Sequence, residues 1–440
     1  MDYREELARK TVSVEEAVMA IPSNSYLYIY GPSEAFGLLE NLQLLKGKRS
    51  GIRMINELHH SGHPFYEDEE MRGVVDCESP FFMRFCTELQ KRGRMSYIPG
   101  HLWHTYHDVI ARNAREGVGT SVYAISCSPM DKHGYFSSGI CGMANRELVE
   151  NADIVIVEVN ENMPRTFGHT HIHISEVDYV YPGPNKMIYF KDRPMTEADR
   201  AIGSLIADMI PDEATIQLGI GSMPNAVAEA LRDKHDLGVH TEMLNDSIIG
   251  LIKCGAVTNA KKTLYPGFTV TAFSYGSQDA YDFMDDNPTI LHLPIDVVND
   301  PAVIARNRRF VSVNAALQVD LMGQCSSEAI GTLQISGIGG QTVTAMGARL
   351  APEGKSIICL HSLAMVRGAD GQRHPKSTIV AAHPEGTAIS LNRADVDYVV
   401  TEFGVASLRG ATLARRAREL IAIAHPDYRD ELAFEAKRLF

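Results

Sequence analysis

The sequence predicts an α/β protein in which short buried strands alternate with helices. Runs rich in β-branched residues and Tyr, each closed by Gly or Asn, indicate buried parallel strands at 25–31, 151–160, 213–221 and 395–404. Segments with the helical repeat of apolar residues lie between them at 34–47, 224–238 and 413–424. This alternation is typical of parallel sheets covered by helices.

A weak internal repeat predicts two similar domains. Each half opens with a strand, a Gly turn and a helix, as "YIYGPSEAFGLLENL" and "IQLGIGSMPNAVAEAL". Each half closes with Ala-Asp, a strand and a Glu, as "RELVENADIVIVEVN" and "LNRADVDYVVTEFG". Any two βα units share such features, so chance similarity is the alternative to duplication. A Pro and a charge cluster at 189–203 mark the joint, which predicts domains 1–190 and 191–440.

Composition limits the classes of partner. The 440 residues are 45% hydrophobic and 22% charged, as in soluble globular proteins, and carry a formal net charge of -13. That charge disfavours nucleic acids and anionic membrane surfaces. No apolar run approaches the roughly 20 residues of a spanning helix, and "MDYREELARK" lacks the apolar core of a secretion signal. We expect a cytoplasmic protein that binds small molecules or other subunits.

The cysteines indicate a reducing compartment. There are seven, an odd number, and none forms a C-x-x-C pair. We therefore expect buried, reduced thiols and no disulfides at positions 77, 86, 127, 141, 254, 325 and 359.

Two glycine clusters are candidates for ligand contact. In "LGIGSMPNAV", Gly219 and Gly221 end a strand and Pro224 suits the first turn of a helix, so free amides there attract phosphate or an oxyanion. A tight turn without ligand is the alternative, and Pro224 stands where a dinucleotide-binding GxGxxG needs its third Gly. The second cluster, "SGIGGQ" at 336–341, offers amides to a thioester carbonyl or oxyanion, or else allows close packing.

Histidines and serines give weaker signals. His101, His104 and His107 are spaced along one helical face, and "HTHIH" puts His169, His171 and His173 on one strand face. Zinc sites use such spacings, but neither cluster carries the acid of a known pattern such as H-E-x-x-H, so we expect no metal. The segment "ELHHSGH" at 57–63 is predicted to be a solvated loop. "GIGSM" does not match the nucleophile elbow G-x-S-x-G.

Glu242, in "GVHTEM", is the carboxylate that the pattern singles out. It follows the first glycine loop by about twenty residues and ends the next predicted strand, where open α/β sheets gather ligands. A helix-start carboxylate, favourable to the helix dipole, is the alternative that these few residues alone favour.

Longer blocks resemble the acetyl-CoA hydrolase/transferase family, especially its 4-hydroxybutyrate and butyryl-CoA:acetate CoA-transferase branch. The resemblance covers nearly the whole chain in order. The blocks include "YIPGHL", "SPMDKHGYFSSG", "EVNENMPRTFG", "QLGIGSMPNAV", "GVHTEM", "FSYGSQDAYDFMDDNP", "VVNDPAVIARN", "VNAALQVDLMGQ", "SGIGGQ" and "DVDYVVTEFGVASLRGATLARRARELIAIAHPDYRDEL".

The resemblance implies two similar α/β domains related to ribose-phosphate isomerase, with the active site in the cleft between them. It implies that Glu242 is the catalytic nucleophile and forms a glutamyl-CoA thioester. Coenzyme A or acyl-CoA would be a substrate, a short-chain carboxylic acid the acceptor, and the protein a dimer without metal or redox cofactor. The implied CoA contacts fall on Gly219, Ile220, Gly221, Ser222, Met223, Leu317, Gly339 and Gly340.

Departures from the family pattern leave the acyl specificity open. Val343 and Thr344 replace the usual Asp-Phe after "GGQ", the first loop reads "YGPSEAF", and the histidines at 59, 60, 63, 169 and 171 are unusual. A dicarboxylate acceptor such as succinate or an itaconate-like acid would need a cation, which the 57–63 loop or Arg165 could supply. An acyl-CoA hydrolase, or a non-catalytic CoA or sugar-phosphate binder, are the alternative functions.

Overall fold

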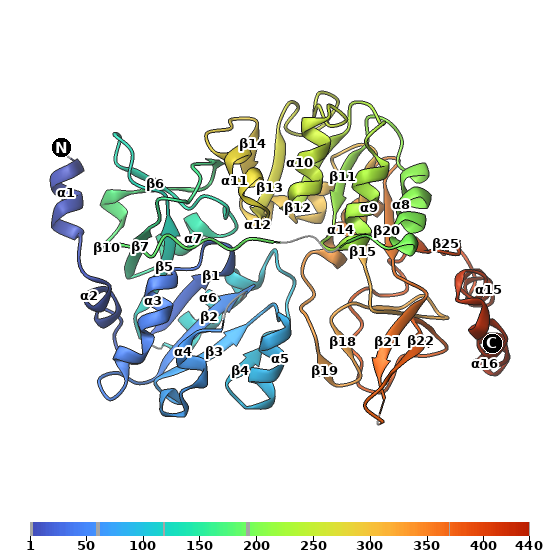
Figure 1. Ribbon diagram of the computed structural model, residues 1–440, viewed down its shortest axis with the longest axis horizontal. Helices are drawn as coiled ribbons and strands as arrows, with labels where there is room; N and C mark the ends of the chain where they lie inside the picture. The colour runs from blue at the N-terminus through green and yellow to red at the C-terminus, as the bar shows by residue number, and fades with distance from the viewer. Residues whose placement is uncertain (1–2, 59–61, 118, 191–193, 369, 440) are drawn as a thin grey trace. The chain divides into compact units, whose positions relative to one another are not determined.

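The computed structural model describes residues 3–58, 62–117, 119–190, 194–368 and 370–439. Its contacts divide the chain into two compact units (Figure 1). Unit 1 comprises Met1–Phe190 and Val270–Val298, and unit 2 comprises Lys191–Thr269 and Asn299–Phe440.

Unit 1 is built around a parallel sheet in the order β10-β7-β5-β1-β2-β3-β4. All five residues of the central strand β1 are buried, because helices cover both faces of such sheets and leave no polar side. The strands are β1 (Tyr26–Tyr30), β2 (Ile52–Glu57), β3 (Val75–Ser79), β4 (Met95–Tyr97), β5 (Ser121–Cys127), β7 (Ile154–Val159) and β10 (Tyr179–Pro182).

The rest of unit 1 consists of helices and short strands. The helices are α1 (Tyr3–Lys10), α2 (Val14–Met19), α3 (Phe36–Asn41), α4 (Pro64–Glu67), α5 (Arg84–Lys91), α6 (Thr105–Glu116), α7 (Asn145–Asn151), α11 (Gln278–Met284) and α12 (Ile295–Val298). Two short pairs complete it: β6 (Tyr135–Ser137) lies antiparallel to β9 (His171–His173), and β8 (Phe167–Gly168) lies parallel to β14 (Ile290–His292). Strand β13 (Thr269–Ser274) begins at the last residue of the first unit 2 segment.

Unit 2 repeats the parallel arrangement, in the order β25-β24-β20-β15-β11-β12 with only β25 antiparallel among these strands. The strands are β11 (Thr215–Leu218), β12 (Gly238–Leu244), β15 (Phe310–Ala315), β20 (Lys355–Cys359), β24 (Tyr398–Thr401) and β25 (Gly404–Ser407). The helices are α8 (Glu197–Met209), α9 (Ser222–Ala230), α10 (Asp246–Lys253), α13 (Pro301–Ile304), α14 (Gln341–Leu350), α15 (Leu413–Ile423) and α16 (Arg429–Leu439).

Smaller strands complete unit 2. β16 (Gln318–Asp320) pairs with β17 (Cys325–Ser326) and β23 (Ile379–Val380), β18 (Ala329–Ile330) with β19 (Leu333–Gln334), and β21 (Leu363–Arg367) with β22 (Arg373–Ser377). A core of buried apolar side chains joins β16, β17 and β23 to α14 and α15.

The α/β fold class is confirmed, and the four predicted strands are β1, β7, β11 and β24. The helix expected over 224–238 ends earlier, at Ala230. The chain then turns through Asp236, which has a left-handed φ of 54°, before it enters β12. The segment 34–47 forms α3 followed by a 3₁₀ turn at Leu42–Leu45.

The two units share part of their strand order. The first strand of each sheet is central: β1 lies between β5 and β2, and β11 lies between β15 and β12. The closing matches do not coincide, since β7 is second outward from β1 whereas β24 is third outward from β11. Residues 270–298 fold with unit 1, although the division at residue 190 places them in the second domain.

Two further expectations concern the cysteines and membrane-spanning helices. Six of the seven cysteines are buried and Cys254 is exposed, which confirms mostly buried thiols. Within the described residues, no helix is both long and apolar enough to cross a membrane.

Candidate active site

Glu242 lies inside strand β12 and does not start a helix. The strand continues to Leu244, and helix α10 begins at Asp246. The cap of α10 is Asn245, whose side-chain oxygen accepts a hydrogen bond of 3.1 Å from the Ile248 amide. The helix-start interpretation of Glu242 is therefore wrong, because a neighbouring amide side chain already performs that role.

The register of the sheet brings Glu242 and the first glycine loop to the same edge. Strands β11 and β12 are parallel, and Ile216 pairs with Val239. Gly219 and Glu242 each come three residues later, so both lie toward the carboxyl ends of adjacent strands. This is the edge at which open α/β sheets bind ligands.

Asn299 binds the Glu242 carboxylate, and Gly340 packs closely beside it. Asn299 Nδ2 donates a hydrogen bond of 2.5 Å to Glu242 Oε2, and the Asn299 side chain is fully buried. A methyl group on Gly340 would overlap Glu242 Oε2 and would lie 2.5 Å from Asn299 Nδ2. Gly340 is the N-cap of helix α14, so only a residue without Cβ lets this helix begin beside the carboxylate.

Burial sets the protonation of Glu242. It raises the pKa of the carboxyl from 4.5 to about 7, while the hydrogen bond from Asn299 lowers it. Glu242 thus exchanges its proton near neutral pH, in the range that suits acid–base or nucleophilic chemistry.

A raised pKa alone does not distinguish a catalytic carboxylate, as Glu158 in unit 1 shows. Burial raises the pKa of Glu158 to about 7 as well. Both of its oxygens are occupied, however, by the Gly37 amide at 2.6 Å, the Phe36 amide at 3.2 Å and the Tyr181 hydroxyl at 2.6 Å. Glu158 therefore ties the start of α3 to β7 and β10, which is a structural role.

The loop 219–223 combines two glycines with an exposed apolar residue. The Gly219 amide donates 2.9 Å to the Val313 carbonyl, which extends the β11–β15 pairing by one residue. Ile220 is 45% exposed, and Gly221 adopts a φ of 118° that side chains rarely allow. Ser222 and Met223 form the first turn of α9, with Pro224 in that turn as predicted. The loop therefore presents backbone at the edge that also carries Glu242.

The second glycine cluster reaches the same edge through α14. Gln341 Nε2 donates 3.0 Å to the carbonyl of Ala315, the last residue of β15. Gly339 is buried with a left-handed φ of 57°, and Leu317 is half-buried just beyond β15. The structure thus brings the predicted residues 219–223, 242, 317, 339 and 340 to one edge of the unit 2 sheet, while their contacts with CoA remain a prediction.

The departures at Val343 and Thr344 serve the core. Val343 is 3% exposed. Thr344 Oγ1 accepts hydrogen bonds from Ser312 Oγ at 3.0 Å and Asn314 Nδ2 at 3.1 Å, in a polar layer that also includes Gln217. This layer adjoins the glycine loop, because Gln217 and Asn314 lie near the carboxyl ends of β11 and β15.

The histidine clusters are not arranged as metal sites. His104 is the N-cap of α6, so His101 and His104 precede the helix rather than share its face. His107 Nδ1 lies 2.6 Å from Glu147 Oε1 on the wall of a cavity of about 410 Å³ in unit 1. His169 lies outside β9, which contains His171 and His173. Among the residues that the structure describes, no group of three or more His, Cys, Asp or Glu side chains could hold a metal ion.

The cations suggested for a dicarboxylate acceptor are already engaged or not described. Arg165 Nη2 donates 3.0 Å to Asp131 Oδ2, and Arg165 Nη1 contacts the Pro129 and Tyr135 carbonyls. His63 is 3% exposed and packs beside Phe65, contrary to a solvated loop. His59 and His60 lie outside the described residues.

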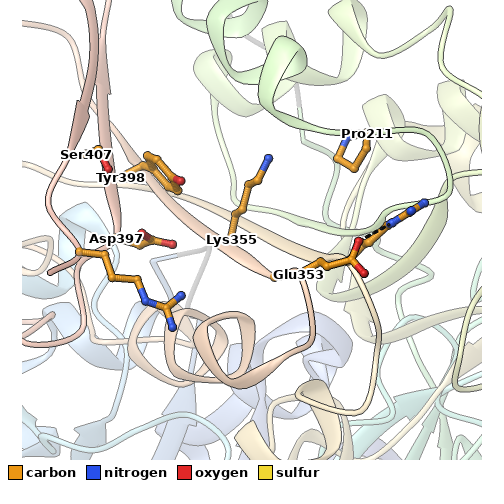
Figure 2. A pocket seen from close by; sticks show the side chains of 9 residues that line it. Pro211, Glu353, Lys355, Asp397, Tyr398 and Ser407 are labelled. Carbon is orange, nitrogen blue, oxygen red and sulfur yellow. Dashed lines mark hydrogen bonds and ion pairs between the residues drawn. The ribbon is translucent and has the colours of Figure 1, made fainter.

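A hollow of unit 2, of about 490 Å³, lies at the opposite edge of the sheet (Figure 2). Lys355 and Tyr398 line it at the amino ends of β20 and β24. Within it Arg309 Nε lies 3.0 Å from Glu353 Oε2, and Lys355 Nζ donates a hydrogen bond to the Met209 carbonyl. The hollow is thus separate from the edge that carries Glu242.

Asn299 is the residue that sequence reasoning missed. It lies 57 residues from Glu242 in the chain, directly before the Asp300 cap of α13. The quoted block "VVNDPAVIARN" contains it, but an Asn before Asp-Pro is typical of a helix start, so only the fold reveals its contact with Glu242.

Comparison with known proteins agrees with this arrangement. Models of the N-terminal and C-terminal domains of acetyl-CoA hydrolase/transferase match residues 1–191 and 276–436. A 4-hydroxybutyrate coenzyme A transferase of Clostridium kluyveri is 37% identical over 100% of both chains. A butyryl-CoA:acetate CoA-transferase of Anaerostipes caccae is 40% identical over 78% of this chain and 75% of its own. The crystal structure of RipA from Yersinia pestis aligns with a TM-score of 0.90 and 36% identity, and covers 100% of this chain and 99% of that one. The chain belongs to the acetyl-CoA hydrolase/transferase family.

Proposed function

We propose that the protein is an acyl-CoA:carboxylate CoA-transferase that works through a glutamyl-CoA thioester on Glu242. The observation that carries the proposal is the geometry of this carboxylate, with one oxygen held 2.5 Å from Asn299 Nδ2 and in close contact with Gly340. A half-buried carboxylate held by a hydrogen bond is placed for attack on a bound thioester, because it needs little reorientation to reach the carbonyl carbon.

The reaction is a sequence of exchanges at two carbonyl carbons. The Glu242 carboxylate attacks the thioester carbonyl and the carbon–sulfur bond breaks. CoA leaves as thiolate, and the acyl group stays on Glu242 as a mixed anhydride. The thiolate then attacks the glutamyl carbonyl, which releases the first acid as carboxylate and leaves glutamyl-CoA thioester. The incoming carboxylate reverses both steps and departs as its own CoA ester. No redox partner is needed.

Each tetrahedral intermediate carries an oxyanion that needs hydrogen-bond donors. Backbone amides of the 219–223 loop and of the glycines at 337–340 are the candidates, because both segments lie at the same sheet edge as Glu242. The long CoA handle supplies binding energy far from the reacting carbon, which holds the thioester at Glu242.

The pH dependence of the first half-reaction follows from the raised pKa. Only ionised Glu242 attacks, so the rate of adduct formation should fall as pH drops below about 7. Asn299 stabilises the ionised form, so Asn299→Ala should move this acidic limb upward by about one pH unit. Rapid-quench rates between pH 5.5 and 9 measure both limbs, and coincident limbs would contradict the assigned role of Asn299.

Trapping the covalent intermediate tests the proposed function. Incubation with acyl-CoA followed by borohydride should reduce the glutamyl thioester, inactivate the enzyme and change the mass of the peptide that contains Glu242. Glu242→Ala should give no adduct under the same conditions. A non-catalytic CoA or sugar-phosphate binder would stay unmodified, so an unmodified wild-type peptide would disprove the proposal.

Hydrolysis is the alternative outcome of the same intermediate, because water can also attack a glutamyl thioester. Release of free CoA measured with and without an acceptor acid separates the two. A transferase should need the acid to turn over, whereas a hydrolase should release CoA at the same rate without it.

We propose short-chain monocarboxylates of the acetate, butyrate or 4-hydroxybutyrate type as acceptors. The engagement of Arg165 by Asp131 supports this choice over dicarboxylates, because a second carboxylate needs a cation of its own. Succinate or an itaconate-like acid remains the alternative, and relative rates with a panel of acids distinguish them.

A further inference from the structure

The start of helix α9 lacks an ordinary cap. Its N-cap residue is Gly221, which has no side chain and makes no side-chain capping hydrogen bond. Helix starts normally rely on Ser, Thr, Asp or Asn at that position to satisfy their free amides and fix the entering chain. The glycine loop that the proposed function assigns to CoA is therefore not held by its own cap.

A buried carboxylate from the neighbouring helix contacts this turn instead. Ser222 Oγ donates a hydrogen bond of 3.0 Å to Asp199 Oδ1, and His361 Nε2 lies 2.8 Å from the same oxygen. The Asp199 side chain is 1% exposed, whereas that of His361 is 35% exposed. Three segments distant in the chain thus converge on one oxygen.

The other oxygen of Asp199 anchors the carboxylate to its own helix. The Thr196 amide and hydroxyl donate to Asp199 Oδ2 at 2.8 and 2.7 Å, as part of the capping box of α8. Burial raises the pKa of Asp199, but hydrogen bonds from Thr196, His361 and Ser222 outweigh it and keep the pKa below its usual value. The carboxylate is thus an ionised, fully hydrogen-bonded group.

Close packing makes this anchor rigid. Helices α8 and α9 lie side by side (Figure 1), and a methyl group on Gly203 of α8 would lie 2.6 Å from the Ala226 carbonyl of α9. Because the two helices are in direct contact, the hydrogen bond between Asp199 and Ser222 joins the first turn of α9 to the closely packed helix α8.

We propose that Asp199 is a positioning residue that holds Ser222, and through it the 219–223 loop, in the conformation that binds acyl-CoA. The proposal rests on the proposed function. Within the described part of the chain, Asp199 contacts the loop through Ser222, while the more exposed His361 completes the hydrogen bonding of the same carboxylate.

Ser222→Ala tests the link by removing one hydrogen-bond donor from the buried Asp199 carboxylate. The acyl-CoA concentration that half-saturates adduct formation should rise about tenfold, the effect of losing one hydrogen bond to a charged group. The limiting rate should fall as well, because the same loop offers amides to the developing oxyanion, and the Tm should fall no further than in Thr196→Val, which loses a comparable hydrogen bond. Asp199→Asn should give a similar rise, and the double variant no more than the larger single effect.

Thr196→Val is the matched control. It removes a hydroxyl bound to the other oxygen of the same carboxylate, so it should lower the Tm and leave the half-saturating concentration unchanged. An equal rise in Thr196→Val, an unchanged value in Ser222→Ala, or additive effects in the double variant would each overturn the inference. If the wild-type protein forms the adduct but the variants give any of these overturning results, only this inference fails. If wild type forms no adduct, the proposed function fails with it.

Discussion

Glu242→Gln should abolish CoA transfer, with a loss of at least about 10³-fold in kcat/KM. Gln keeps the shape of the side chain, and its carbonyl oxygen can still accept the hydrogen bond from Asn299 Nδ2. An amide is not a nucleophile, however, so neither the anhydride nor the thioester can form. Steady-state transfer of CoA to acetate or butyrate measures the loss.

The same variant should be more stable than wild type at alkaline pH. Glu242 has a folded pKa raised from 4.5 to about 7, so the folded state favours the protonated form. Stability is therefore lost as pH rises from about 4.5 to 7, where the unfolded chain ionises while the folded carboxyl stays protonated, and the full penalty of at most about 3 kcal/mol is present above pH 7. Glu242→Gln should raise the Tm at pH 8 and leave it nearly unchanged at about pH 4, where Glu242 is largely protonated in both the folded and the unfolded chain. An equal Tm at pH 8 would show that the carboxylate is not desolvated.

Gly340→Ala should reduce activity by about 10²-fold, because the added methyl group would overlap Glu242 Oε2 and crowd Asn299 Nδ2. Only small shifts of the carboxylate are available, since Asn299 is fully buried. The displaced carboxylate should no longer meet the thioester carbonyl in line. Single-turnover adduct formation measures this loss directly.

Gly250→Ala is the matched control for Gly340→Ala. Gly250 lies inside helix α10, and a methyl group there would meet nothing within 4 Å. It should keep full activity and gain about 0.5–1 kcal/mol of stability, since Ala is the better helix former. Equal activities in the two variants would contradict the close approach of α14 to Glu242.

The sequence predicted the secondary structure well where apolar runs were long. The alternation of buried strands and amphipathic helices is a local property, so β1, β7, β11 and β24 could be located from it. Helix ends were less certain: the 224–238 prediction missed the left-handed turn at Asp236, because the polar residues there fit a helix surface as well as a loop.

The candidate site was predictable only in part. Glycine clusters and Glu242 were visible because each has a local signature. Local sequence could not decide whether Glu242 starts a helix or belongs to a strand. In the fold Asn245, three residues later, caps α10 in its place. The contact with Asn299 depends on strand order and close packing between distant segments, and neither leaves a local pattern in one sequence.

The engagement of Arg165 was equally invisible to sequence reasoning. An isolated Arg in a polar segment suits an anion site, but its partner Asp131 lies 34 residues away in the chain. Its pairing follows from the tertiary structure alone. The sequence therefore could not show whether Arg165 is available to bind an acceptor acid.

The placement of residues 270–298 in unit 1 has a consequence for folding. Glu242 belongs to the first segment of unit 2, while Asn299 is the first residue of the second segment. Glu242 and Asn299 are therefore joined only after the chain has passed through residues 270–298 of unit 1, and Gly340 follows later in the chain. During synthesis the Glu242 carboxylate therefore exists before Asn299 can donate a hydrogen bond to it. The site is complete only when unit 2 is complete. A nascent or truncated chain should therefore lack activity even where part of it is folded.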